Sequence, residues 1–227
     1  MILPGPEDFI DIHTHGMIAA EGVFAVENLM AHENINPEKI ESGVFSAGIH
    51  PWYLDEENQK ELIDYIKEIS HNERLIALGE AGFDKIRGPS IPLQRSVFSE
   101  QVLIAEKVKK PLFIHCVRSW DELMAAHRNL KPSMPWIIHG FRGKKELASQ
   151  LIPKGMYFSF WFDFIIRNES SDLIRFMPVD RIFLETDGAD IDIRDIYRKV
   201  AADLSMEVSD LKKIIYNNYL TLFGRTK

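Results

Sequence analysis

The chain has 227 residues, 45% of them hydrophobic, which is enough for the core of a single domain over residues 1–227. It contains no run of about 18 apolar residues and no basic segment followed by an apolar one at its start, so we expect neither a transmembrane helix nor a secretory signal. The single cysteine, Cys116, excludes an internal disulfide and is typical of a reducing, cytoplasmic compartment. The net charge of -7 gives no overall attraction for nucleic acid, so a polyanion must be met by local positive groups.

Short apolar runs followed by amphipathic stretches recur along the chain. Several runs are almost wholly apolar, as expected for parallel strands that are buried on both faces. This alternation predicts an α/β fold with a parallel sheet, here a (β/α)8 TIM-type barrel. The predicted strands are Phe9–His13, Val23–Val26, Val44–Ile49, Leu75–Gly79, Leu112–His115, Trp136–His139, Met156–Phe160 and Ile182–Glu185.

Helical periodicity lies between the predicted strands. Apolar residues fall on one helical face within residues 62–69, 97–105 and 208–222, and Ser119 to Glu122 has the pattern of a capping box that opens a further helix. The chain between Gly16 and Val23 is too short for a full crossover helix. We therefore expect a barrel whose first helix is missing or shortened.

Side chains that can bind a metal gather at one position in this pattern, namely at or just after the C-terminal ends of the predicted strands. In an eight-stranded α/β barrel the active site is built at that face, so residues far apart in sequence meet there. These side chains are Asp11, His13, His15, His50, Glu80, His115, His139 and Asp187.

The first strand ends in two histidines, His13 and His15, that are two residues apart. Residues at this spacing point to the same side of a strand, so both imidazoles can reach one metal. Asp11 lies one step deeper, where it could orient a ligand. His115 and His139 could each be a buried core histidine, but their repeated position at strand ends favours a role as ligands.

Two carboxylates complete the expected metal site. Glu80 follows an apolar run, where a carboxylate is costly unless it is paired or bound to a metal, and its two oxygens can bridge two ions. Asp187 ends the last strand and can both hold a metal and accept the proton of an attacking water. Asp84 is expected to stabilise its loop, and Glu185 to support a ligand.

Histidine and carboxylate ligands without cysteine suit Zn²⁺, Mn²⁺, Ni²⁺ or Fe²⁺, with Mg²⁺ also open, and do not resemble an oxygen cage for Ca²⁺. Two divalent ions balanced by Glu80 and Asp187 leave a charge that a hydroxide and a phosphodiester would neutralise. Arg118 could contact a phosphate, or form a surface salt bridge. Arg142, Lys144 and Lys145 could form a basic rim or a solvated helix start, and Trp52 and Trp161 could stack on a base or simply pack.

Together these residues resemble the TatD family of metal-dependent deoxyribonucleases, among the amidohydrolase-like barrels. The resemblance implies that His13, His15, Glu80 and Asp187 hold one metal and that Glu80, His115 and His139 hold the other, with His50 beside the substrate phosphate. The matching segments are Asp11–His15, Gly48–Trp52, Gly79–Asp84, Gln94–Gln101, Ile114–Arg118, His139–Phe141, Glu185–Asp187 and Asn217–Phe223.

The chain departs from the family pattern at two places. The segment between the first two strands is short, and the loop from Gly188 to Arg194 is short and acidic where family members have a longer basic loop. We expect a nuclease or phosphodiesterase that cleaves DNA or short nucleic-acid fragments by means of a water activated by two metals.

The main alternative is a metal-dependent amidase or deacylase that acts on a small or aminoacyl ester or amide. Many such barrels bridge their metals with a carboxylated lysine, but no lysine occupies that place here, and Glu80 can bridge instead. A phosphoesterase of the polymerase-and-histidinol-phosphatase type also begins with two spaced histidines, but the later Asp-His pair of that family is missing. A binding module that kept the fold is disfavoured, because unused buried carboxylates and histidines burden stability.

Overall fold

The computed structural model describes residues 2–16, 20–37, 43–165 and 167–224. Eight strands form one sheet in the order in which they occur in the chain, and every resolved pairing between neighbours is parallel. The predicted (β/α)8 barrel class is therefore confirmed. The strands are β1 (Phe9–Thr14), β2 (Val23–Met30), β3 (Val44–Gly48), β4 (Leu75–Asp84), β5 (Leu112–Val117), β6 (Trp136–Ile138), β7 (Tyr157–Phe160) and β8 (Ile182–Leu184).

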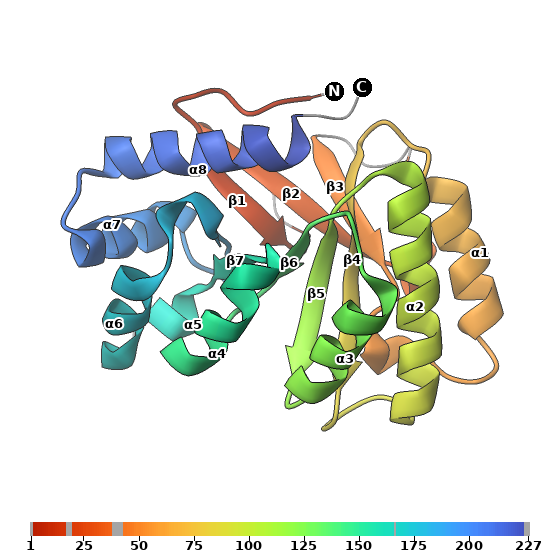
Figure 1. Cartoon of the computed structure of the whole chain (residues 1–227). Coiled ribbons are helices and arrows are strands. Elements are labelled where there is room, and N and C mark those ends of the chain that lie inside the picture. The colour runs from red at the N-terminus through yellow and green to blue at the C-terminus, as the bar shows by residue number, and fades with distance from the viewer. Residues whose placement is uncertain (1, 17–19, 38–42, 166, 225–227) are drawn as a thin grey trace. The chain divides into compact units, whose positions relative to one another are not determined.

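Helices follow the strands from β3 onward (Figure 1). The α-helices are α1 (Gln59–Ile69), α2 (Ile91–Val108), α3 (Trp120–Leu130), α4 (Lys145–Leu151), α5 (Phe162–Ile165), α6 (Asn168–Phe176), α7 (Ile193–Leu204) and α8 (Val208–Phe223). Short 3-10 turns are η1 (Ala31–Glu33), η3 (Pro51–Tyr53), η4 (Ile152–Lys154) and η5 (Val179–Arg181). In the described part of the chain, no helix combines the length and hydropathy that a membrane span requires.

The chain divides into two compact units, and each is described by itself. The first unit comprises Asn28–Trp136, and the second comprises Ile2–Glu27 together with the chain from Ile137 onward. The expectation of a single domain over residues 1–227 stays a prediction.

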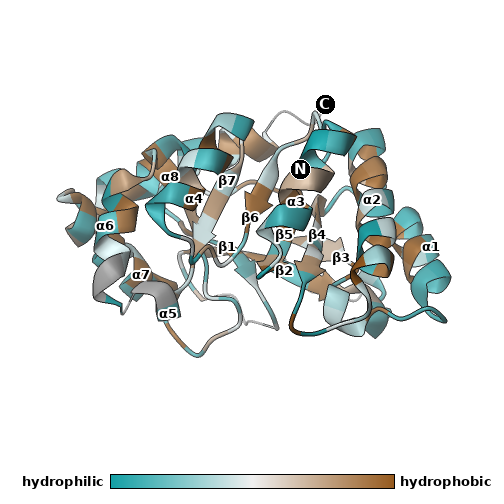
Figure 2. Cartoon of the chain, turned by 60° about the horizontal axis from the view of Figure 1, so that its bottom comes forward, coloured by the Kyte–Doolittle hydropathy of each residue, from teal (hydrophilic) through white to brown (hydrophobic). Residues whose placement is uncertain are grey.

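In the first unit, α1 and α2 cover the sheet formed by β3, β4 and β5 (Figure 1). The predicted apolar faces are the ones that are buried: α1 buries Leu62 and Ile66, and α2 buries Val97, Phe98 and Val102. Figure 2 shows the result as hydrophobic and hydrophilic sides on both helices. Removal of these side chains from water is the main force that holds the helices against the strands.

In the second unit, α7 and α8 cover β1 and β8. The buried hydroxyl of Tyr197 on α7 accepts a hydrogen bond from the backbone N–H of Ile10 and donates one to the carbonyl oxygen of the same residue, at 3.0 and 3.1 Å. The side chain of Asp11 joins β1 to the end of β8 by accepting from the N–H and the hydroxyl of Thr186, at 3.1 and 2.6 Å. These bonds hold β1 in place at the point where the two histidines begin.

Two local expectations need correction. The strand β4 continues to Asp84 because its last residues pair with β5, Gly82 lying opposite His115; Glu80 therefore lies within the strand and not beyond its end. Helix α3 starts where the sequence predicted, but without the capping box, because the Ser119 hydroxyl donates to the carbonyl oxygen of Val117 instead.

The sequence predicted that the first helix of the barrel, in the connection between β1 and β2, is missing or shortened. Residues 15–16 and 20–22, which the structure describes there, contain no helix, in agreement with that expectation. Residues 17–19 lie outside the described residues.

The side chain of Lys110 fastens the C-terminal end of α1, and its pH dependence is a test of this packing. Its ammonium group donates to the carbonyl oxygens of Ser70 and Asn72 at 2.8 and 2.9 Å, and burial lowers the pKa of Lys110 to about 8. Between pH 8 and the ordinary lysine pKa, the unfolded chain therefore binds more protons than the folded chain. The free energy of unfolding should rise with pH across this window.

We expect this rise to be about 1 to 2 kcal/mol larger in the wild type than in Lys110→Met, because the ammonium keeps partial access to water. Urea unfolding at a series of pH values between 7 and 10.5 measures it, with the exposed Lys109→Met as the control for loss of a charge. Parallel curves for wild type and Lys110→Met would contradict the role of Lys110.

Candidate functional site

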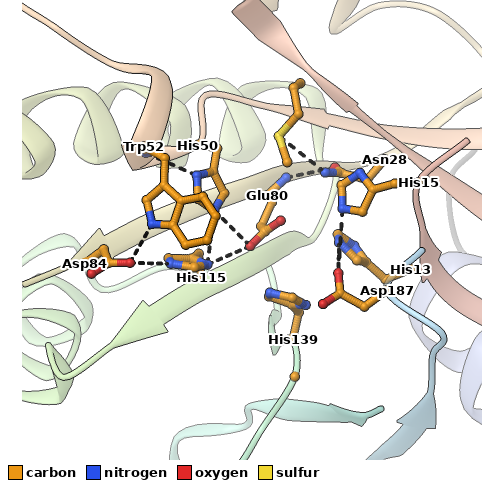
Figure 3. A network of polar contacts seen from close by, with 12 residues as sticks. His13, His15, Asn28, His50, Trp52, Glu80, Asp84, His115, His139 and Asp187 are labelled. Atoms are coloured by element: carbon orange, nitrogen blue, oxygen red, sulfur yellow. Dashed lines mark hydrogen bonds and ion pairs between the residues drawn. The ribbon is translucent and has the colours of Figure 1, made fainter. Parts of the chain in front are cut away.

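The first unit holds a buried group of two imidazoles and a carboxylate. His50 follows β3 and precedes η3, Glu80 lies in β4, and His115 lies in β5, so that three consecutive strands, or the turn after one, each supply one side chain. The Nε2 atom of His50 and the Nδ1 atom of His115 lie 3.2 and 2.7 Å from the same oxygen, Oε1 of Glu80 (Figure 3). Their ligand atoms all lie within 4.8 Å of one another, a spacing suited to a metal ion.

Glycines set the position of Glu80. A Cβ atom on Gly48 would lie 2.4 Å from the Cα atom of Gly79, so β3 and β4 approach more closely here than any larger residue allows. The backbone N–H of Glu80 donates to Oδ1 of Asn28 at 3.0 Å, and the hydroxyl of Ser46 donates to the same oxygen. Asn28 therefore fixes the backbone of Glu80, and Ser46 in turn fixes the side chain of Asn28.

The hydrogen-bond partners of His50 determine which of its two ring nitrogens carries the proton in the neutral form. Its Nδ1 accepts a hydrogen bond from the backbone N–H of Trp52 at 3.1 Å. The neutral ring therefore carries its proton on Nε2, the atom that faces Glu80. His50 is thus arranged to donate a proton or hydrogen bond, which agrees with the expected place beside a substrate oxygen better than with a role as a metal ligand.

His115 lies between two carboxylates. Its Nε2 lies 3.2 Å from Oδ2 of Asp84, while its Nδ1 lies 2.7 Å from Oε1 of Glu80. If Nε2 donates to Asp84, a neutral ring directs the lone pair of Nδ1 toward the Glu80 carboxylate. The Nε2 atom of His50 lies 3.1 Å from this Nδ1, and its N–H can donate to it or to Glu80. The lone pair of Nδ1 and the carboxylate of Glu80 together also suit a metal ion.

Asp84 is the residue behind His115, and sequence reasoning assigned it only to its loop. It does accept from the backbone N–H groups of Ile86 and Arg87, but it also accepts from Nε1 of Trp52 at 2.6 Å. Burial acts to raise the pKa of Asp84, but the hydrogen bonds from His115, Trp52 and the loop backbone hold it well below its ordinary value. The strand alternation that puts residues 80, 82 and 84 on one side of β4 was the signal for this role.

The second unit holds the other group. Oδ1 of Asp187 lies 3.8 Å from Nε2 of His13 and 3.6 Å from Nε2 of His15 (Figure 3). The two imidazoles meet edge to face with their ring centres 5.1 Å apart, so both histidines reach the same carboxylate, as the alternation in β1 predicts. The backbone of Asp187 adopts a φ of 54°, and its N–H donates to the carbonyl oxygen of His13 at 3.1 Å.

His139 lies beside His13, with ring centres 4.6 Å apart. Its Nδ1 lies 3.2 Å from Oε1 of Glu185, which also accepts from the N–H of Gly140, while the Ser159 hydroxyl donates to the other oxygen of Glu185. Burial acts to raise the pKa of Glu185, but His139 and these donors keep it below the ordinary value. The ionised Glu185 orients His139 so that Nε2 carries the lone pair, which is the supporting role expected of this glutamate.

Asp11 supports the backbone and not an imidazole. Its carboxylate accepts from the N–H groups of His13 and Thr186, and burial raises the pKa of Asp11 to about 7 against the opposing effect of Thr186. The expected support from this residue is therefore indirect.

The other predicted site residues have different surroundings. Arg118 is exposed directly after β5, and the described residues place no hydrogen bond or ion pair on it. Arg142 lies 4.0 Å above the centre of the Trp161 ring and pairs with Asp163 at 3.2 Å. Trp52 does not only pack against its neighbours, because its indole Nε1–H donates a hydrogen bond to the carboxylate of Asp84.

The contact between Asp84 and His115 generates a prediction. Asp84→Asn removes the ionised acceptor that orients His115, so the affinity for Zn²⁺ or Mn²⁺ should fall about 10- to 100-fold while the fold is retained. Isothermal titration of the metal-free protein measures the affinity, and circular dichroism checks the fold. Asp121→Asn, on the exposed partner of Lys85, is the matched control; equal affinities for the two variants would contradict the role of Asp84.

Comparison with known proteins bears on this site. Residues 30–224 match the model of the family described as TatD related DNase. An uncharacterized metal-dependent hydrolase of Buchnera aphidicola is 33% identical over 64% of this chain and 56% of its own length. The uncharacterized metal-dependent hydrolase YcfH of Escherichia coli is 26% identical over 79% of this chain and 73% of its own, and the 3'-5' ssDNA/RNA exonuclease TatD of Citrobacter koseri is 26% identical over 86% and 78%.

Solved structures share the fold. The TatD homologue YjjV of Escherichia coli superposes with a TM-score of 0.80 at 17% identity, over 97% of this chain and 99% of that one. A hydrolase of the TatD family from Entamoeba histolytica gives a TM-score of 0.79 at 18% identity, with the same coverage. The match to the family model confirms the resemblance drawn from the sequence, and with it the expectation of a metal-dependent hydrolase. The chain belongs to the family of TatD-related DNases.

Proposed function

We propose that the protein is a metal-dependent phosphodiesterase that hydrolyses single-stranded DNA or short nucleic-acid fragments. The observation that carries the proposal is the convergence of His50 and His115 on one oxygen of the buried Glu80, with Asp84 fixing the second nitrogen of His115. A related protein of Citrobacter koseri is named a 3'-5' ssDNA/RNA exonuclease, which supports a nucleic-acid substrate.

We assign the metals to the side chains that the sequence predicted. His13, His15 and Asp187 lie together in the second unit, and Glu80 and His115 lie together in the first. The predicted division, with Glu80 as a ligand of both ions and His139 on the same ion as His115, is kept as a prediction. The roles of Glu80 as a bridge between two ions and of all these ligands in one centre stay predictions. Bound divalent ions supply an acidified water and stabilise negative charge on the phosphate oxygens.

The chain's own groups account for the proton movements. Asp187 accepts the proton of the attacking water, because its carboxylate is partly exposed and lies within 3.8 Å of both His13 and His15. The Nε2–H of His50 donates to an oxygen of the substrate phosphate. Arg118 is exposed next to β5, and its guanidinium, which has no ion-pair partner among the described residues, contacts a phosphate of the substrate.

Metal analysis tests the assignment. We expect about two ions of Zn²⁺, Mn²⁺, Mg²⁺, Ni²⁺ or Fe²⁺ per chain after loading. Glu80→Ala should lose both ions because the bridge is gone, whereas His115→Ala should chiefly weaken one. Elemental analysis after gel filtration gives the stoichiometry, and His127→Ala, in helix α3 and outside both groups, is the control. Normal metal content in Glu80→Ala would show that Glu80 does not bridge.

Substrate length is the second test. The net charge is -7 and the loop after Asp187 is short and acidic, so a long strand should gain little binding beyond the metal centre. We expect the affinity of Asp187→Asn for single-stranded oligonucleotides to change little with length and to fall only shallowly with salt, since few phosphates are neutralised. Affinity that grows steadily with length and collapses with salt would reveal an extended groove.

The same assays separate the alternative reaction. Wild-type protein loaded with metal is incubated with bis-p-nitrophenyl phosphate, short single-stranded DNA and a panel of amides and aminoacyl esters. Cleavage of the phosphodiesters supports the proposal. Turnover of an amide or ester without any phosphodiesterase activity would replace it by the amidase or deacylase. The cytoplasmic location, inferred from the single cysteine, stays a prediction.

A further inference from the structure

An exposed arginine, Arg87, lies beside the ligand group of the first unit. Its guanidinium carbon is 4.3 Å from the centre of the Trp52 ring and 6.0 Å from that of Tyr53. The Trp52 ring in turn meets the ring of His50 edge to face at 4.9 Å and that of His115 at 5.7 Å. One indole therefore separates the arginine from the two imidazoles.

The charge of Arg87 is not neutralised by the protein. Its neighbours in the same region are paired: Lys85 contacts Asp121 at 2.7 Å, and Arg95 contacts Glu122 at 2.5 Å. Across the described residues, no carboxylate lies within ion-pair distance of the Arg87 guanidinium. What distinguishes Arg87 is its position: its unpaired guanidinium lies on Trp52 beside the ligand group, where it is available to an anionic substrate.

Hydrogen bonds within the protein order the loop that carries Arg87 before any substrate binds. Oδ1 of Asp84 accepts from the backbone N–H of Arg87 at 2.9 Å, and the side-chain amide of Gln94 donates to the carbonyl oxygens of Asp84 and Pro89. Gly88 has a φ of 107°, and a Cβ atom on it would lie 2.5 Å from the carbonyl oxygen of Pro51. Only glycine permits this close approach, which brings the loop against the segment that carries Trp52.

We propose that Arg87, supported on Trp52, binds a phosphate of the substrate strand next to the phosphate that is cleaved. A guanidinium stacked on an aromatic ring keeps its N–H groups directed outward in its own plane, where they fit two phosphate oxygens. Because the loop is already ordered, little conformational entropy is lost on binding. The inference rests on the proposed phosphodiesterase function and adds a binding subsite to it, one that a nucleotide strand can reach and a small phosphodiester cannot.

Binding of a short single-stranded DNA to the metal-loaded Asp187→Asn protein tests the subsite, followed by fluorescence anisotropy over a salt series. Adding Arg87→Gln should weaken the affinity about 5- to 20-fold, the loss of one charged hydrogen-bonding contact at an exposed site. The slope of log affinity against log salt should decrease by about 0.7, as for one phosphate contact on a single strand. Arg87→Lys should keep the slope and recover only part of the affinity.

Arg128→Gln is the matched control. It removes the same charge from another exposed arginine of the first unit, in the last turn of α3, and should change neither affinity nor slope. Unchanged affinity and slope in Arg87→Gln would overturn the inference.

Kinetics with the otherwise wild-type enzyme distinguish a binding role from a structural one. In Arg87→Gln, the KM for the oligonucleotide should rise while hydrolysis of bis-p-nitrophenyl phosphate, which has a single phosphate, stays within about two-fold of wild type. An equal loss on both substrates would show that Arg87 only supports the site, and the inference would be wrong. If the wild type cleaves neither phosphodiester, the proposed function fails, and the affinity series still decides whether Arg87 binds phosphate.

Discussion

The burial of carboxylates is the constraint on which the rest of this structure depends. Glu80 is only 3% exposed, Asp84 3% and Glu185 0%. An ionised carboxylate in such surroundings is stable only when positive groups and hydrogen-bond donors surround it. Imidazoles, hydroxyls and backbone N–H groups take that role at Asp84 and Glu185, and the imidazoles at Glu80 are placed where a metal ion can contribute as well.

The same arrangement occurs once in each unit. In the first, Asp84 stands behind His115, and in the second, Glu185 stands behind His139. In both cases a buried carboxylate fixes one nitrogen of the ring, so that the other nitrogen carries the lone pair a metal needs. The carboxylates are in turn held by donors from the neighbouring strand or loop, which leaves the ring little freedom to turn. A histidine restrained in this way loses less entropy when it binds a metal.

The position of the unpaired arginines outside these groups bears on how the chain can meet a polyanion. Several exposed arginines and lysines are paired with acidic residues, as in Arg142–Asp163 and Lys85–Asp121. Arg87 and Arg118 are arginines of the first unit that are unpaired among the described residues, and both follow strands that carry metal-ligand candidates. With a net charge of -7, we expect a substrate strand to be bound through a few contacts close to the reaction and not through a wide basic surface.

Hydrophobic periodicity was enough to predict the strands, the helices α1, α2 and α8 and the barrel class, because burial of one face dictates where apolar residues recur. Strand alternation also predicted that His13 and His15 share a target, and the strand-end pattern selected the ligand candidates. The function of Asp84 could not be inferred in this way, because it depends on β4 continuing past Glu80 to pair with β5. The stacking of Arg87 on Trp52 depends on a close approach at Gly88 between segments about 35 residues apart. Contacts of this kind follow from strand register and loop packing, which only the tertiary structure decides.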